Sequence, residues 1–393
     1  MTAKFKPYFK YFFFATSIIV SRGLEYIVLF YAALYLTKDS YGELEFYKKI
    51  IELGAVGLAF GLPSLLLTYT KSHDSKVYLN LLGVLFVLTL SIIIAPVFWI
   101  LDYQFLIIPI LFHAIFFNNG IIPVFFITNF GSNKASLYKI ITSVLFYVGV
   151  LMILILHSSP EHAFIFINYF LIGLGIVFII ILFDRYKINL AILKKYYSLF
   201  KKLLISSLTL VVSNFANVMF LYTDIMILKL ISNTPNVDIA NYSFVLNIAN
   251  MLILLPFTLV QVDIEKIKAL KNIRPKAVKI FKLVLLFAVI IIIFYLCLIK
   301  TYYKDYNSTL TLFLIIMIAK LSQTNSILHG AILLIKKKFR LNLIINITML
   351  TLNIVLSYAL YNIMMLNGIA IASVITLTIR YFILQHFTKF GQT

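Results

Sequence analysis

The chain has 393 residues, of which 62% are hydrophobic and only 12% are charged. About half of the residues of a soluble globular protein are apolar and about a quarter are charged, so this composition excludes a water-soluble fold. The net charge of +20 would suggest nucleic-acid binding in a soluble protein, but in a membrane protein it is the expected result of basic cytoplasmic loops.

Apolar runs of about 20 residues recur along the chain, which is the length needed to cross a hydrocarbon core of about 30 Å. We therefore predict an all-α integral membrane protein with about twelve transmembrane helices. In chain order the predicted helices cover residues 11–36, 43–69, 77–100, 104–128, 137–157, 162–183, 203–231, 239–262, 280–299, 308–335, 341–361 and 368–388.

Lysine and arginine residues concentrate in alternate loops, and this asymmetry predicts the orientation. The loops on the side of the N-terminus contain the basic clusters 4–10, 71–76, 134–139, 185–202, 266–282 and 336–340, together with Lys389. The opposite loops contain only Lys38, Lys300 and Lys304. Because basic loops stay on the cytoplasmic side, we predict cytoplasmic termini and a multi-pass protein of the bacterial inner membrane.

A basic segment at residues 187–202 separates the predicted helices into two groups of six. Its apolar residues have helical spacing with lysines between them, which predicts an amphipathic helix on the anionic inner leaflet. We therefore predict an N-terminal six-helix lobe at residues 1–186, this linker, and a C-terminal six-helix lobe at residues 203–393.

The first two predicted helices carry charged residues at positions where charges are costly. The first helix contains Arg22 and Glu25, and the second contains Glu45, Lys48, Lys49 and Glu52. A charged side chain near the bilayer centre costs at least about 2.5–3.5 kcal/mol, so each of these needs a partner, water or a function. The spacing places Arg22 and Glu25 on one face, and it allows Glu45–Lys49 and Lys48–Glu52 pairs at i,i+4.

Two interpretations of these charges remain open. In the first, they pair with one another and only fix helix packing. In the second, they line a hydrated central cavity, where the cations contact an anionic substrate. We adopt the second as the working hypothesis, because intramembrane ionisable residues usually mark a functional path and self-pairing would need only one pair.

The C-terminal half has fewer such residues. Asp224 lies in the seventh predicted helix, where it is expected either to bind a coupling cation or to neutralise a neighbouring lysine. Lys320 lies in the middle of the tenth helix and is expected to face the cavity, with snorkelling or ion pairing as the alternatives. Arg380 lies in the inner half of the last helix, where it is expected either to bind substrate or, because it is near the cytoplasmic end, to snorkel.

The sequence contains no P-loop, no HExxH motif and no GxSxG motif. Its single cysteine, Cys297, excludes an internal disulfide and offers no metal-binding cluster. We therefore predict no catalytic residues, no metal site, no nucleic-acid partner and no cofactor other than a coupling H⁺ or Na⁺.

Several local patterns resemble those of a known family. Their positions in the predicted helices are Ser40–Leu44, Gly57–Leu65, Tyr222–Leu228, Ile239–Tyr242 and Gly368–Ala372. In this order, they resemble the polysaccharide-transporter branch of the multidrug/oligosaccharidyl-lipid/polysaccharide (MOP) superfamily, most closely the Wzx-type O-antigen flippases. The resemblance spans nearly the whole chain and implies two six-helix lobes around a cavity that opens alternately to each face.

The resemblance also implies a function. Such flippases move an undecaprenyl-diphosphate-linked oligosaccharide from the cytoplasmic to the periplasmic leaflet, with cavity cations holding the diphosphate or acidic sugars. Arg22 matches a first-helix arginine of related lipid flippases, so that role carries over to Arg22. This chain has no arginine in the eighth helix, and Lys48, Lys49 and Lys320 are the expected substitutes. A polysaccharide polymerase and a chain-length regulator are candidate partners, beside membrane lipids.

Three other functions compete with this interpretation. A multidrug or cation antiporter of the same superfamily would favour a cavity dominated by carboxylates and aromatic residues, whereas cations here at least match the buried acids. An O-antigen polymerase or acyltransferase would normally need a large outer loop, and no predicted loop is long enough. A purely structural membrane protein leaves the buried charges unexplained.

Overall fold

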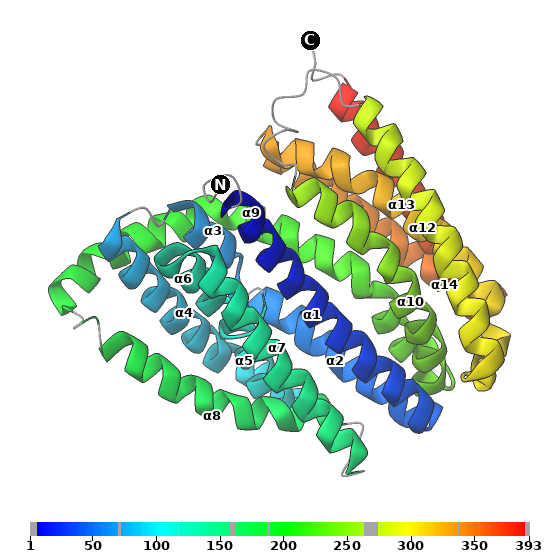
Figure 1. Cartoon of the computed structure of the whole chain (residues 1–393), viewed down its shortest axis with the longest axis horizontal. Helices are drawn as coiled ribbons and strands as arrows, with labels where there is room; N and C mark the ends of the chain where they lie inside the picture. The colour runs from blue at the N-terminus through cyan, green and yellow to red at the C-terminus, as the bar shows by residue number, and fades with distance from the viewer. Residues whose placement is uncertain are drawn as a thin grey trace. The chain divides into compact units, whose positions relative to one another are not determined.

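The computed structural model describes residues 6–69, 72–118, 120–156, 162–184, 186, 189–262, 274–336 and 338–389. These residues form helices and short connections, and none of them lies in a β-strand (Figure 1). The α-helices are α1 (Lys6–Tyr35), α2 (Lys38–Ala59), α3 (Leu62–Tyr69), α4 (His73–Ile100), α5 (Ile107–Ile115), α6 (Ile121–Phe130), α7 (Ser132–Ile155), α8 (Ala163–Asp184), α9 (Leu190–Ile231), α10 (Pro235–Val262), α12 (Arg274–Thr301), α13 (Leu310–Ile335) and α14 (Phe339–Lys389). Two 3₁₀ helices are η1 (Gln104–Leu106) and η3 (Lys304–Thr309).

All twelve predicted apolar runs are largely helical over the described residues, but the second and the fourth are divided by residues of positive φ. The second run divides into α2 and α3 at Phe60 and Gly61, whose φ angles are 48° and 65°. A side chain placed on Gly61 would contact Val211, so this left-handed corner favours glycine both by conformation and by space. The continuous second helix expected from the sequence is therefore wrong at this corner.

The fourth predicted run is also broken, into α5 and α6, near Asn118, which has a φ of 30°. The break leaves backbone groups without their helical partners. The hydroxyl of Tyr138, on α7, donates to the carbonyl of Phe116 over 2.8 Å and satisfies one of them.

The chain divides into two compact units. Unit 1 contains the described residues up to Ala32 and Tyr47–Val211, and unit 2 contains Ala33–Phe46 and the described residues from Val212 onward. The division thus falls inside α9 rather than at a separate linker, because residues 190–202 are the first part of that 42-residue helix. It also assigns the end of α1 and the first part of α2 to unit 2, while the six-helix lobes at 1–186 and 203–393 stay a prediction.

Within unit 1, α4 packs against α5 and α6, and α8 packs against α5 and α7. Aromatic rings fill the space between these helices: Phe126 stacks on Tyr138 with 4.6 Å between ring centroids. The hydroxyl groups of Ser21 and Ser143 lie 2.9 Å apart and connect α1 to α7. Unit 1 is therefore a helical bundle in which aromatic packing and polar contacts between helices both contribute to the core.

Within unit 2, α10, α12, α13 and α14 lie side by side (Figure 1). The rings of Tyr295 and Phe313 stack with 3.7 Å between centroids and join α12 to α13. The long α14 consists of two helices that meet at Met365, where φ is 51° and ψ is −132°. These two helices correspond to the eleventh and twelfth predicted runs.

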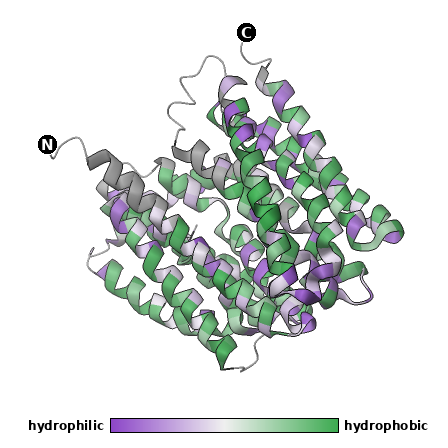
Figure 2. Cartoon of the chain, turned by 45° about the vertical axis from the view of Figure 1, so that its right-hand side comes forward, coloured by the Kyte–Doolittle hydropathy of each residue, from purple (hydrophilic) through white to green (hydrophobic). Residues whose placement is uncertain are grey.

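Among the described residues, seven segments are long and apolar enough to cross a membrane, and most helices are hydrophobic along much of their length (Figure 2). They are Asp74–Ile100, Ser132–Ile155, Ala163–Leu182, Pro235–Leu254, Ala277–Thr301, Lys304–Leu333 and Phe339–Thr388. An eighth is the pair Val211–Phe220 and Tyr222–Ile231, bent by 59°. The chain is therefore a multi-pass membrane protein.

The count of twelve spans and the cytoplasmic termini stay predictions. The last segment, at 50 residues, is more than twice the length of one crossing and contains the kink at Met365. Residues 1–5, 70–71, 185, 187–188, 263–273, 337 and 390–393, which carry part of the predicted basic asymmetry, lie outside the described residues.

Candidate functional site

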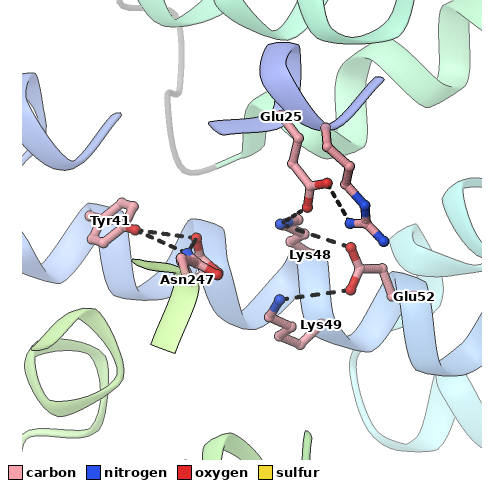
Figure 3. A network of polar contacts seen from close by, with 8 residues as sticks. Glu25, Tyr41, Lys48, Lys49, Glu52 and Asn247 are labelled. Carbon is pink, nitrogen blue, oxygen red and sulfur yellow. Dashed lines mark hydrogen bonds and ion pairs between the residues drawn. The ribbon is translucent and has the colours of Figure 1, made fainter. Parts of the chain in front are cut away.

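Unit 1 contains an ion-pair network that we call the cationic cluster, formed by Arg22, Glu25, Lys48, Lys49 and Glu52 (Figure 3). Glu25 is at its centre. One of its carboxylate oxygens, Oε2, lies 2.7 Å from Arg22 Nη1 on the same helix, and the other, Oε1, lies 2.7 Å from Lys48 Nζ on α2. The predicted shared face of Arg22 and Glu25 is confirmed by this contact.

The second carboxylate of the cationic cluster also has two lysine neighbours. Glu52 Oε1 lies 3.9 Å from Lys48 Nζ, and Glu52 Oε2 lies 3.7 Å from Lys49 Nζ. The predicted Lys48–Glu52 pair is thus confirmed. Three cations share two carboxylates, so the cationic cluster has a formal charge of +1.

The members of the cationic cluster differ in exposure. The side chains of Lys48 and Lys49 are each 5% exposed and that of Glu25 is 9% exposed, whereas that of Arg22 is 53% exposed. Glu25 therefore orients the Arg22 guanidinium, while Lys48 offsets the charge of the same carboxylate. This arrangement leaves Arg22 positioned for an additional anion, for which its planar group of donors is well suited.

A cavity of about 10 Å³ adjoins the cationic cluster and is lined by Lys48, Glu52, His113, Tyr147 and three apolar residues. Among the described residues, His113 Nε2 is buried and has no hydrogen-bond partner. The ring of His113 lies against those of Phe117 and Phe146, at 4.6 and 5.2 Å between centroids.

Glu45 differs from its expected pairing with Lys49. It belongs to unit 2, is fully buried, and accepts hydrogen bonds from Asn247 Nδ2 at 2.8 Å and from the Tyr41 hydroxyl at 3.3 Å (Figure 3). Lys49 pairs with Glu52, three residues further along α2. The i,i+4 expectation is wrong here because a long-range partner on α10 supplies the donor for Glu45.

Asp224 lies at a hydrogen-bonding centre of unit 2. Its Oδ1 accepts from Asn353 Nδ2 at 3.0 Å, and its Oδ2 accepts from Ser373 Oγ at 2.8 Å and from the hydroxyl of Tyr242. Asn353 Oδ1 in turn lies 3.2 Å from the hydroxyl of Thr376, which orients the amide with its nitrogen toward Asp224. Three helices, α9, α10 and α14, thus meet around one carboxylate.

Lys320 faces the same part of unit 2. Its side chain is buried, and its Nζ donates to Gln323 Oε1 over 3.0 Å. Asp224, Tyr242, Lys320, Gln323 and Ser373 line one cavity of about 20 Å³, whose remaining wall is apolar. The structure therefore supports the expectation that Lys320 faces a cavity rather than lipid.

Arg380 points into unit 2. Its Nη2 donates to Asn346 Oδ1 over 3.0 Å, and its guanidinium lies 5.9 Å from the centroid of the Phe220 ring. These contacts favour an interior position over snorkelling to the membrane surface.

Sequence reasoning did not find several members of these sites. Tyr242 was noted only as part of the family-like pattern Ile239–Tyr242. Ser373 and Asn247 gave no signal. A buried carboxylate such as Asp224 is expected to have hydrogen-bond donors around it. Asn353 and Ser373 lie 129 and 149 positions away along the chain, so the fold is needed to identify them as these donors.

No protein-family model matches the chain, and neither does any curated protein sequence. Solved structures do match. A MATE structure in the straight conformation aligns with a TM-score of 0.61 at 13% identity, over 98% of this chain and 95% of that one. An outward-facing multidrug resistance MATE family transporter of the MOP superfamily gives a TM-score of 0.60 at 12% identity, over the same shares of the two chains. The chain therefore has the fold of the MATE transporters.

Proposed function

We propose that this chain is a non-enzymatic transporter of the MOP superfamily. In this proposal it is a Wzx-type flippase that moves an undecaprenyl-diphosphate-linked oligosaccharide from the cytoplasmic to the periplasmic leaflet of a bacterial inner membrane by alternating access. The MATE-like fold supports a transporter, and the family-like sequence patterns support the polysaccharide branch.

The observation that carries the proposal is the excess cation of the cationic cluster. Arg22 is oriented by Glu25 yet half exposed, and the carboxylate that orients it is also neutralised by Lys48. A lipid diphosphate brings two or more negative charges, and charge-assisted hydrogen bonds of arginine to phosphate are about twice as strong as neutral ones. In this proposal Arg22 holds the diphosphate, and Lys48 and Lys49 add to the positive electrostatic potential at the site.

Unit 2 supplies the remaining proposed groups. Lys320 and Arg380 add positive charge for the anionic head, and Asp224 is the proposed coupling group, since it is the buried carboxylate beside the unit 2 cavity. Glu45 stays a proposed charge-pairing or ion-coupling residue of unit 2, and its hydrogen-bond donors there are the neutral groups of Asn247 and Tyr41. Glu25 and Glu52 are assigned to charge compensation within the cationic cluster.

A multidrug or cation antiporter is the second candidate. The observation that favours it is the apolar wall of the cavity beside Asp224, which includes Phe220, Leu246 and Leu377. A buried carboxylate with an aromatic and aliphatic wall suits a hydrophobic cation.

Deletion and complementation in the source bacterium separate the two candidates. The flippase proposal expects loss of surface polysaccharide, accumulation of lipid-linked repeat units on the cytoplasmic side, and unchanged susceptibility to cationic drugs. Arg22→Ala should reproduce this loss at normal protein levels. An intact surface polysaccharide together with increased drug susceptibility would support the antiporter instead.

A further inference from the structure

In the described part of unit 2, the hydrogen-bond donors to the Asp224 carboxylate are neutral groups. Tyr242, Asn353 and Ser373 each donate one hydrogen bond to it. Such donors complete the hydrogen bonding of a carboxylate but bring no formal charge. A buried carboxylate that stays ionised is stabilised further by a nearby cation.

Lys320 is placed to be that cation. It lies on α13, it is as deeply buried as Asp224, and both line a cavity of about 20 Å³. This volume holds about one water molecule, so there is little solvent between the groups that line it. The opposite charges of Asp224 and Lys320, which line the same cavity, attract each other. Because the rest of the wall is apolar, solvent screens this attraction weakly.

The same cavity disfavours a free metal ion. A cation that approached Asp224 from the cavity would meet the ammonium group of Lys320. The amide oxygen of Gln323, which lines the cavity, already accepts from Lys320 Nζ at 3.0 Å, and Asn353 presents its nitrogen, not its oxygen, to Asp224. Two amide oxygens that could ligate a hard cation are therefore engaged elsewhere.

We infer that Lys320 is a tethered counter-cation for Asp224 and that it excludes metal cations such as Na⁺ from this centre. Replacing Lys320 by a neutral residue opens the centre to Na⁺. This inference rests on the proposed role of Asp224 as the coupling group, and it narrows that role to coupling without a metal ion.

Equilibrium binding of ²²Na⁺ to the purified full-length protein tests the inference, with choline chloride holding the ionic strength constant. The wild type should show no saturable Na⁺ binding in the physiological range. Lys320→Gln should show saturable Na⁺ binding in this range, with an affinity at least about tenfold above the upper limit set by the wild type. Lys320→Gln/Asp224→Asn should lose this binding. Lys229→Gln is the matched control, because it removes one positive charge from unit 2 at a lysine that instead contacts Asn236 and the Phe46 ring.

Saturable Na⁺ binding by the wild type that Asp224→Asn abolishes would overturn the inference. Folded Lys320→Gln protein that binds no Na⁺ would also overturn the inference. If Lys320→Gln does not fold, Lys320→Met, which conserves the volume of the side chain, takes its place. No sugar lipid is present in these measurements. If the flippase proposal fails, the expected Na⁺ binding stays the same. If the Na⁺ binding differs from this expectation, the proposed role of Arg22 in lipid binding is unaffected.

Discussion

Lys48 and Glu25 form a buried ion pair between α2 and α1, with 2.7 Å between Nζ and Oε1. Glu25 also holds Arg22, so one carboxylate joins a buried lysine to a half-exposed arginine. The buried pair and the exposed pair share an acid but have different surroundings. They are expected to differ in what they contribute to stability and in what they contribute to binding.

Glu25→Ala should destabilise the protein far more than Arg22→Ala. Removing Glu25 leaves Lys48 buried without this partner, a change that costs about 3–5 kcal/mol in comparable buried pairs. Removing Arg22 breaks a half-exposed pair, for which about 1 kcal/mol or less is expected. Unfolding in mixed micelles measures both, and Glu25→Ala/Lys48→Met should recover part of the loss. Equal destabilisation by the two single substitutions would show that Lys48 does not depend on Glu25.

Gly42→Ala should destabilise unit 2, because a side chain at this position of α2 would overlap the backbone carbonyl of Asn236 at the start of α10. Backbone cannot move aside as a flexible side chain can, so a cost of about 1–3 kcal/mol is expected. Gly173→Ala on α8 is the control: nothing lies within 4 Å of the added atom, and helix propensity predicts a gain of up to about 1 kcal/mol. A neutral Gly42→Ala would contradict the close approach of these two helices.

Asn353→Ala should cost about 1–3 kcal/mol, because it leaves the buried Asp224 Oδ1 without its 3.0 Å donor. Asn362→Ala on the same helix provides the comparison. Its amide bonds only the carbonyl of Tyr358, at an exposed position, so a change within about 0.5 kcal/mol is expected. Thermal unfolding of the two purified variants measures the difference, and similar midpoints would argue against a structural role for the Asp224 hydrogen bonds.

Cysteine accessibility tests the predicted orientation. The chain has one cysteine, Cys297, so Cys297→Ser provides a background without thiols. In the Cys297→Ser background, Asn307→Cys should react with a membrane-impermeant maleimide in cells with a permeabilised outer membrane. Ser198→Cys should react only after the inner membrane is opened. Both positions are exposed in the structure. Labelling of both from the same side would contradict the alternation of loops on which the count of twelve spans depends.

Local features of this fold could be predicted from the sequence because they depend on spacing. The apolar runs predicted the helical segments, and the three-residue spacing of Arg22 and Glu25 predicted their contact. The i,i+4 spacing also predicted the Lys48–Glu52 contact. Such features depend only on the geometry of a single helix.

Features that depend on the backbone at a corner, or on a distant helix, could not be predicted. The positive φ of Phe60 and Asn118 divides two runs that read as continuous apolar helices. Glu45 has a lysine four residues away, yet it bonds Asn247 on α10, about 200 residues further along the chain. The hydrogen-bonding partners of Asp224 likewise come together only through packing of α9, α10 and α14.

In the proposed flippase, Arg22 is held by Glu25, is supported by Lys48, and binds the anionic head of a lipid-linked sugar. Transbilayer movement of an undecaprenyl-diphosphate-linked oligosaccharide by the purified protein in proteoliposomes tests this role. Arg22→Ala should lower the rate by roughly 10–100-fold, as expected for one lost charge-assisted contact of about 1.5–3 kcal/mol. Arg22→Lys should retain part of the rate, and the exposed Lys304→Ala should retain all of it. Movement by Arg22→Ala at the wild-type rate would show that Arg22 does not bind the lipid head.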